Sequence, residues 1–197
     1  MNSIPSDEGT HGAPDLSATV LAVPNCSEGA DPDILAALAD ACRVQGAHLL
    51  DQHSDADHDR TVLTLAGHPM AVHDALFALA EACVAHIDVR RGHGMHPRIG
   101  ALDVVPLVRL SGDGVLEGHV AHAVAERIGE DLGVPVFLYG ELAVDPERTR
   151  PHHFRREGLE GLARDLDSGA LIPDYGPRHA HPTAGCCLVG VRGPLVA

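Results

Sequence analysis

The sequence predicts a layered α/β domain in which helices pack against a β-sheet. Short apolar segments rich in β-branched residues alternate with segments whose apolar residues recur at helical spacing. Apolar residues make up 45% of the 197 residues, which is enough to bury one core. Because aromatic residues make up only 3% and tryptophan is absent, we expect a core of Ala, Val, Leu and Ile.

The first half of the chain is predicted to run strand, helix, strand, strand, helix. Residues 18–23 (ATVLAV) are a strand that leads into a turn. The next segment has Asp31 as a helix N-cap, Pro32 in the first turn and Gly46 as the helix end. Two strands and a helix follow at residues 47–50, 61–66 and 69–86. The helix between the third and fourth strands favours a parallel arrangement of those two strands.

The second half continues the alternation. Residues 101–110 (ALDVVPLVRL) are the fourth strand, and Pro106 within it indicates a sheet edge or a bulge. The other expected elements are a helix at 116–132, a strand at 134–138, a charged and weakly helical region at 145–169, and a strand at 186–191. Residues 1–16 are polar and rich in Gly and Pro, so we expect a disordered tail followed by a folded domain at 17–197.

Composition excludes several classes of function. The net charge is −14 without a basic stripe, which argues against a nucleic-acid partner. All 14 basic residues are arginine, so a Schiff-base lysine is excluded. The five cysteines form no CxxC pair, and Cys186 and Cys187 in an apolar strand are expected to be buried structural thiols. Without a signal segment or a long apolar run, we expect a cytoplasmic protein without a membrane partner.

Four polar loops are expected to gather at strand ends, where layered α/β proteins bind ligands. They lie at residues 24–29, 53–60, 91–100 and 176–185. The third loop combines His93 and His96 with glycines and arginines, which suits acid/base chemistry beside an anion site. The residues alone leave open whether His96 is catalytic or a histidine held inertly in a turn.

A metal site is the alternative for the run His53-Ser54-Asp55-Ala56-Asp57-His58-Asp59. Histidine and aspartate bind zinc or iron, but this spacing matches no metal motif, so a hydrogen-bonded polar loop is favoured. His119 and His122 are three residues apart on a predicted helix and are expected to face solvent. We therefore predict no metal site.

The sequence resembles the formiminotransferase N-terminal subdomain family over about residues 20–192. The strongest piece is the motif that runs from Gly94 through His96-Pro97-Arg98 to Val104. The supporting segments, in family order, are Val23-Pro24-Asn25-Cys26-Ser27-Glu28-Gly29, Asp59-Arg60-Thr61-Val62, Pro135-Val136-Phe137-Leu138-Tyr139-Gly140-Glu141, Pro173-Asp174-Tyr175-Gly176-Pro177 and His181-Pro182-Thr183-Ala184-Gly185.

The resemblance implies a fold and an activity. The expected fold is a mixed β-sheet with helices packed on its outer face. The expected activity is transfer of a formimidoyl group between tetrahydrofolate and L-glutamate or a related amine, a reaction of histidine degradation and one-carbon metabolism. The alternative is a binding or regulatory module that holds a folate-like or acidic ligand without turnover.

The resemblance also assigns residues. The family's catalytic histidine falls on His96, where it would act as a general acid/base. The folate-contacting stretch falls on Gly176, Pro177, Arg178, His179, Ala180, His181, Pro182, Thr183, Ala184 and Gly185. By inference, Arg60 or Arg98 binds a substrate carboxylate, and Asn25 and His53 line the same crevice.

Three features depart from the family pattern. Met95 stands where the loop commonly carries glutamate before the histidine, and Ala184 stands where mammalian members carry an aromatic residue. Family enzymes continue into a C-terminal subdomain that completes the folate cleft, and this chain ends at Ala197. We therefore expect a homodimer, or a separate protein that supplies the second subdomain.

Overall fold

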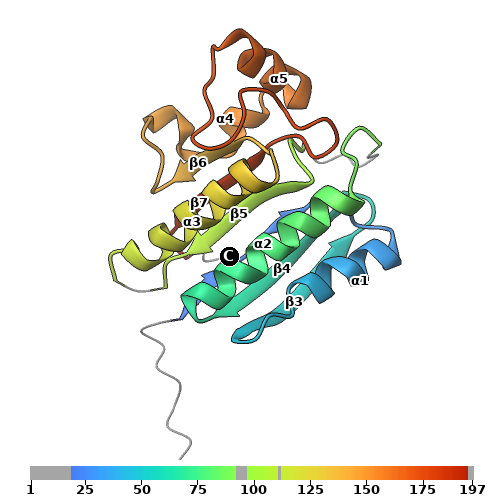
Figure 1. The fold of residues 1–197 in the computed structure, drawn as a ribbon, viewed down its shortest axis with the longest axis vertical. Coiled ribbons are helices and arrows are strands. Elements are labelled where there is room, and N and C mark those ends of the chain that lie inside the picture. Colours follow the sequence, from blue (N-terminus) through green and yellow to red (C-terminus); the bar gives the residue numbers. More distant parts are fainter. Residues whose placement is uncertain (1–18, 92–96, 111, 195–197) are drawn as a thin grey trace, which may run out of the picture.

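A computed structural model describes residues 19–91, 97–110 and 112–194, which form a single sheet with helices on both faces (Figure 1). The strands are β1 (Val20–Ala22), β2 (Asn25–Cys26), β3 (Ala47–Asp55), β4 (Arg60–Gly67), β5 (Leu102–Val108), β6 (Val136–Gly140) and β7 (Cys187–Arg192). The helices are α1 (Pro32–Ala41), α2 (Pro69–His86), α3 (Val115–Asp131), the 3-10 helix η2 (Pro146–Thr149), α4 (His152–Arg155) and α5 (Gly158–Ser168). The predicted tail at 1–16 lies outside the described residues.

The sheet is mixed, as the resemblance implied. β1 and β2 share one position, and both pair antiparallel with β4 on one side and β5 on the other. β3 is antiparallel to β4 at one edge, while β7 is parallel to both β5 and β6 towards the other edge. The order is therefore β3, β4, β1 with β2, β5, β7 and β6, and the elements from β1 to β5 form a split β-α-β arrangement. β4 and β5 run in the same direction, as predicted, but β1 and β2 lie between them.

Pro106 lies in the interior of the sheet, so the expectation of an edge strand is wrong. β5 is hydrogen-bonded to β1 and β2 on one side and to β7 on the other. The strand formed by β1 and β2 is interrupted between them, at Val23 and Pro24. There the N–H of Val23 donates to the carbonyl of Pro106 at 2.9 Å. Proline is tolerated here because the neighbouring strand itself breaks beside it.

Helices α1, α2 and α3 lie side by side on one face of the sheet (Figure 1). α1 starts as predicted, since the side chain of Asp31 accepts from the N–H groups of Asp33 and Ile34, but it ends at Ala41, before Gly46. The buried residues of α2 and α3 include several small ones, among them Ala75, Ala80, Ala121 and Ala125. Small side chains let the helices approach closely, which fits a core poor in aromatic residues.

The opposite face is covered only in part. Alternate residues of β6 point to the two faces, so Val136 and Leu138 join the main core while Phe137 and Tyr139 join a second cluster. That cluster contains the buried residues of α4 and α5: Phe154, Leu162 and Leu166. The outward residues of β4, such as Val62 and Thr64, stay half-buried. This leaves the β3–β4 part of the face accessible.

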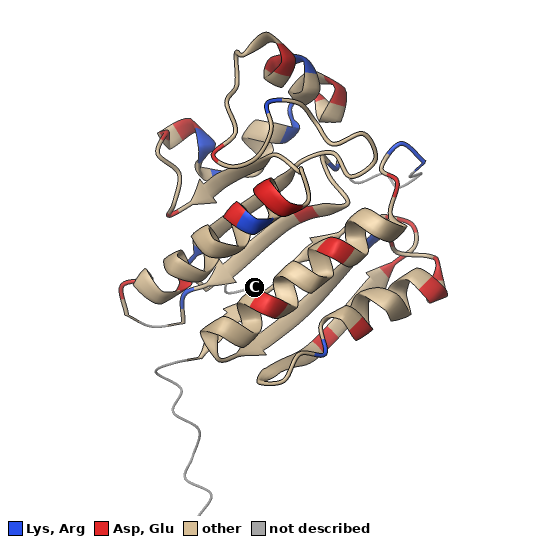
Figure 2. Ribbon diagram, in the orientation of Figure 1, with Lys and Arg blue, Asp and Glu red and all other residues tan. Residues whose placement is uncertain are grey.

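The cysteines are buried, as predicted for Cys186 and Cys187. Burial raises the pKa of the Cys186 thiol to about 12, so this thiol is protonated at neutral pH. Among the described residues, no helix is both long and apolar enough to cross a bilayer. Arginines are scattered over separate elements among the acidic side chains of the helices (Figure 2).

Candidate functional site

Side-chain and backbone bonds join the four polar loops at one end of the sheet. The hydroxyl of Ser27 donates to the carbonyl of Gly100 at 2.7 Å, which links the first and third loops. Arg98 forms an ion pair with Asp59 at 2.7 Å, which links the third and second. The N–H of Val89, just before the third loop, donates to the carbonyl of Thr183 in the fourth at 2.9 Å. The grouping predicted from the sequence is confirmed.

His96, the predicted catalytic residue, lies with Met95 outside the described residues. The flanks of this segment are both bonded to the turn at 181–185. Before it, Val89 bonds Thr183; after it, the N–H of Ala101 donates to the carbonyl of Ala184 at 2.8 Å. The N–H of Cys186 donates to the carbonyl of Ile99, also at 2.8 Å. The predicted folate segment is therefore joined to both sides of the predicted catalytic loop (Figure 1).

Asn25 and Arg60, two predicted substrate residues, contact each other. The guanidinium of Arg60 donates to the side-chain oxygen of Asn25. Burial lowers the pKa of Arg60, while the nearby Asp103 carboxylate acts in the opposite direction. Arg60 nevertheless stays charged at any physiological pH, so it is a fixed cation held in a partly desolvated position.

The third predicted substrate residue, Arg98, is held by Asp59. The two side chains are each 14% exposed. The other carboxylate oxygen of Asp59 accepts the N–H of Gly29 at 3.2 Å. Asp59 has a positive φ of 50°, an unusual backbone conformation for a residue other than glycine, at the tip of the β3–β4 hairpin. One aspartate thus connects three loops.

Gly29 is required at this junction. A Cβ atom added there would lie 2.1 Å from the carbonyl oxygen of Asp55 and 2.6 Å from the nitrogen of Arg60. Both of these are backbone atoms and cannot rotate away. The glycine in the 24–29 turn therefore permits close contact with the hairpin that carries Arg60.

Asp103 and Arg155 belong to the same cluster, although the sequence analysis gave them no role. Asp103 is 5% exposed, and one of its oxygens accepts the N–H of Ile99 at 2.8 Å. Its other oxygen forms an ion pair with Arg155 of α4. This carboxylate fixes the turn that follows Arg98. Asp59 and Asp103 both lie in segments that carry the family resemblance, and this position could have marked them as site residues. Arg155 lies outside those segments, so nothing in the sequence marked it.

His53 lies in β3 rather than in a loop, because β3 extends to Asp55. Its register partner in β4 is Val62, and Val62 in turn is paired with Asn25 in β2. His53 lines a cavity of about 330 Å³ together with Asp55, His58, Arg60 and Val62. Two imidazoles and a guanidinium thus face one cavity on the accessible part of the sheet, beside Asn25.

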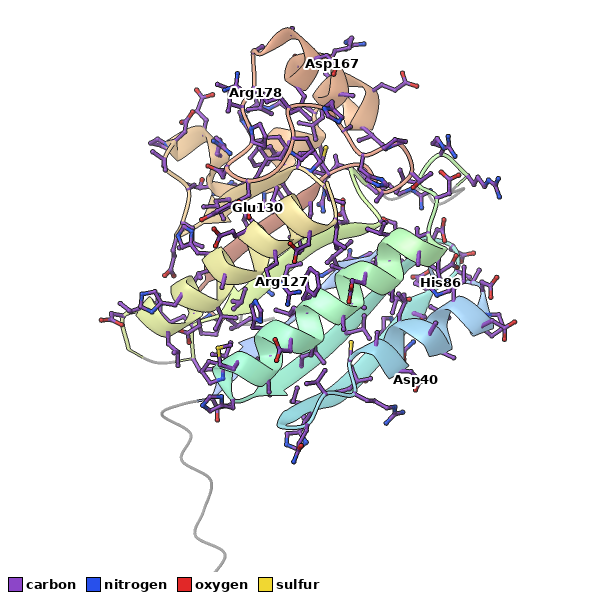
Figure 3. The ribbon with its side chains drawn as sticks, viewed as in Figure 1. Asp40, His86, Arg127, Glu130, Asp167 and Arg178 are labelled. Carbon is purple, nitrogen blue, oxygen red and sulfur yellow. The ribbon has the colours of Figure 1, made fainter. Side chains whose placement is uncertain are left out.

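Two further cavities lie next to this one. A narrow gap of about 10 Å³ is lined by residues that include Asn25, Arg60, Arg98 and Asp103. A larger cavity of about 400 Å³ lies between the start of α1 and the end of α2, where its lining includes Ser27, Asp59, His86 and Arg91. His86 marks the end of α2 in Figure 3. No group of three or more metal-ligating side chains occurs in the described ranges.

The segment 176–185 is fixed at both ends. At its start, Gly176 packs against Gly129 of α3. A Cβ atom added to Gly129 would lie 2.6 Å from the Gly176 nitrogen. Arg178 lies on the side of α5, away from His86 (Figure 3). At its end, His181 and Gly185 bond each other in both directions at 2.9 Å. Ala184, the departure from mammalian members, is 2% exposed, so it is part of the packed core.

The ring of His181 belongs to this turn. Its Nδ1 accepts the backbone N–H groups of Thr183 at 3.3 Å and Ala184 at 3.0 Å. Burial lowers the pKa of His181, which favours the neutral ring. His122 of α3 contacts the segment just before this one, with its Nδ1 2.8 Å from the hydroxyl of Tyr175.

Comparison with known proteins identifies the family. The family model described as "Formiminotransferase domain, N-terminal subdomain" matches residues 19–192. The chain belongs to this family. It is 41% identical over 184 residues to glutamate formimidoyltransferase of Streptococcus pyogenes serotype M1, and the match covers 92% of this chain and 62% of that protein.

Other relatives are more distant. Glutamate formimidoyltransferase of Thermoplasma acidophilum is 37% identical over 89% of this chain and 59% of its own length. Formimidoyltransferase-cyclodeaminase of Gallus gallus is 37% identical over 92% of this chain and 34% of its own length. The chain thus spans less than two thirds of each of these relatives.

Proposed function

We propose that this chain contributes to a folate-dependent formimidoyltransferase, in which tetrahydrofolate and L-glutamate or a related amine are the two substrates. The family supports this assignment, because relatives named glutamate formimidoyltransferase match nearly the whole chain. The structural observation that carries it is the bonding of the 181–185 turn to both flanks of residues 92–96. A folate held by residues 176–185 would then lie beside the flanks of the segment that contains His96.

The reaction needs a group that can exchange protons. The acceptor nitrogen attacks the formimidoyl carbon, and the bond between that carbon and the folate nitrogen breaks. The acceptor loses one proton and the departing nitrogen gains one, so no oxidant or reductant is needed. An imidazole with a pKa near neutrality can accept the first proton and deliver the second, which is typically worth about 100- to 10,000-fold in rate. We assign this role to His96.

We assign the acceptor's carboxylate to His53 and Arg60 in the cavity on the β3–β4 hairpin, because His58 in the same lining is already paired with Asp55 at 2.8 Å. Arg60 is a fixed cation whose guanidinium is oriented by Asn25. His53 lines the same cavity and can add a hydrogen bond. Arg60 lines the cavity, whereas Arg98 does not and is paired with Asp59, so we assign Arg60 as the main carboxylate contact and Arg98 as a support for the loop. Orienting two substrates together can lower the barrier by roughly 7–11 kcal/mol in favourable cases.

A complete folate cleft is proposed to need a second layer over the accessible part of the sheet. That layer would come from a second copy of this chain or from another polypeptide. Light scattering at micromolar concentration distinguishes a dimer from a 20.6 kDa monomer. A monomer that turns over substrate unaided would contradict this requirement.

Turnover tests the proposed function directly. Purified protein is incubated with 5-formiminotetrahydrofolate and with glutamate or other amines, and transfer is followed for the wild type and for His96→Ala. We expect wild-type turnover that His96→Ala abolishes, whereas His93→Ala, a change three residues away, keeps most of it. Folate binding without turnover on any acceptor would instead favour a binding module, and absence of folate binding would exclude both.

A further inference from the structure

Two arginines from distant parts of the chain lie near one buried carboxylate. Asp103 of β5 forms an ion pair with Arg155 of α4, and these side chains are 7% and 16% exposed. Asp103 also lines the narrow gap that Arg60 and Asn25 line. Because the carboxylate carries a single negative charge, it can neutralise one of the two guanidinium groups but not both.

The hydrogen bonds direct the Asp103 charge towards Arg155. One carboxylate oxygen accepts the N–H of Ile99 at 2.8 Å, and the other accepts from the guanidinium of Arg155. The guanidinium of Arg60 donates instead to the side-chain oxygen of Asn25, whose amide nitrogen donates to the carbonyl of Val23 at 2.8 Å. An uncharged amide orients Arg60 without cancelling its charge.

The three charged groups influence one another. Burial lowers the pKa of Arg60, the negative charge of Asp103 raises it, and the positive charge of Arg155 lowers it. Asp103 and Arg155 therefore both lie close enough to Arg60 to change the electric potential at its guanidinium. Their effects are opposite in sign, so the ion pair leaves the positive charge of Arg60 available to an incoming anion.

We propose that Arg155 is a positioning residue for the acceptor: it neutralises Asp103, so that Arg60 can bind the acceptor's carboxylate. This inference rests on the proposed transferase function, in which Arg60 is the main carboxylate contact. Without Arg155, the negative charge of Asp103 acts on Arg60 unopposed and repels a second carboxylate brought to the same guanidinium. Helix α4 thus serves the acceptor site as well as the second core cluster.

Steady-state kinetics of transfer to L-glutamate test this role. Arg155→Gln removes the charge, and we expect the KM for L-glutamate to rise about tenfold, the order of magnitude for one uncompensated charge beside a partly buried site. The kcat should stay close to the wild-type value, because Arg155 does not act on the reacting atoms. Arg155→Lys keeps the charge and should restore most of the lost affinity.

Changes at Asp103 distinguish an electrostatic role from a structural one. In Asp103→Asn the side-chain oxygen can still accept from Ile99, while both arginines lose the opposing charge. This variant should lower the KM for L-glutamate below the wild-type value. In the double variant Arg155→Gln/Asp103→Asn both charges are absent, and the KM should return close to that of the wild type. A double variant that binds L-glutamate no better than Arg155→Gln would overturn the inference.

The matched control is Arg148→Gln. Arg148 of η2 forms a similar ion pair with Asp174, with side chains 14% and 19% exposed. The melting temperature should fall as in Arg155→Gln, but the KM for L-glutamate should not change. An unchanged KM in Arg155→Gln, or an equal rise in Arg148→Gln, would overturn the inference while wild-type turnover leaves the proposed function intact. Absence of wild-type turnover would overturn both.

Discussion

The ion pair between Asp59 and Arg98 should contribute to stability although it lies between loops. The substitution Asp59→Asn tests the effect of the Asp59 charge alone. Asparagine has the same shape, can still accept from the N–H of Gly29 and tolerates the positive φ at this position. Breaking a fully buried pair costs about 3–5 kcal/mol, and exposed pairs contribute at most about 1 kcal/mol. With both side chains 14% exposed, we expect a loss of roughly 2 kcal/mol.

A double-mutant cycle measures this interaction. Urea unfolding is followed by circular dichroism for the wild type, Asp59→Asn, Arg98→Gln and the double variant, and we expect a coupling free energy of about 1.5–2 kcal/mol. The pair Asp40 and Arg43 is the control, since its 2.9 Å separation is similar but its side chains are 73% and 71% exposed. Its coupling should be about 0.3–0.5 kcal/mol.

Equal coupling in the two cycles would refute the reasoning from burial. High salt gives a second check on the same variants. It should remove most of the coupling between Asp40 and Arg43, because exposed charges are screened, and leave most of the coupling between Asp59 and Arg98. Loss of both couplings in salt would show that solvent reaches the loop junction.

Two further predictions concern the pH dependence of the melting temperature and the space for a Cβ atom at two glycines. Burial lowers the pKa of His181 in the folded chain, while the unfolded chain takes up a proton near pH 6.5. The neutral His181 ring therefore contributes its full stability above about pH 6.5, and this contribution is lost as the pH falls towards the lower pKa of the folded chain. The melting temperature should consequently fall more steeply below about pH 6.5 in the wild type than in His181→Asn. Gly29→Ala should prevent stable folding, because its Cβ would overlap backbone atoms, as measured by circular dichroism and soluble yield. Gly133→Ala, at a φ of 65° with nothing within 4 Å of the added Cβ, should cost only about 1 kcal/mol.

Periodicity and turn chemistry predicted most elements of the fold. Asp31 with Pro32 marked the start of α1 correctly, because capping is a local interaction. For Pro106 the edge position was wrong for the opposite reason, whereas the alternative of an irregular pairing agrees with the register shift between β2 and β5. A proline is excluded from an interior strand only if the neighbouring strand is continuous, and the break at Val23 and Pro24 is a property of pairing that the local sequence does not contain.

For the candidate site, the sequence named residues but not the bonds that connect them. Resemblance placed Asn25 and Arg60 in one crevice, and the structure puts their side chains in contact. It gave no partner for Arg98, since Asp59 is 39 residues away and nothing local links them. Arg155 comes from a short helix in a weakly patterned region, so only the folded chain brings it to Asp103.

The attachment of the 92–96 flanks to the turn at 181–185 has a consequence for how the protein folds. Val89 and Ala101 bond to residues that are synthesised near the end of this sequence, just before β7. Contacts so distant along the chain form slowly, because the intervening chain must first be ordered. The split β-α-β unit can therefore assemble early, whereas the bonds of Val89 and Ala101 to the turn at 181–185 form only when β7 docks between β5 and β6. The site proposed for folate should be among the last parts of the folding chain to form.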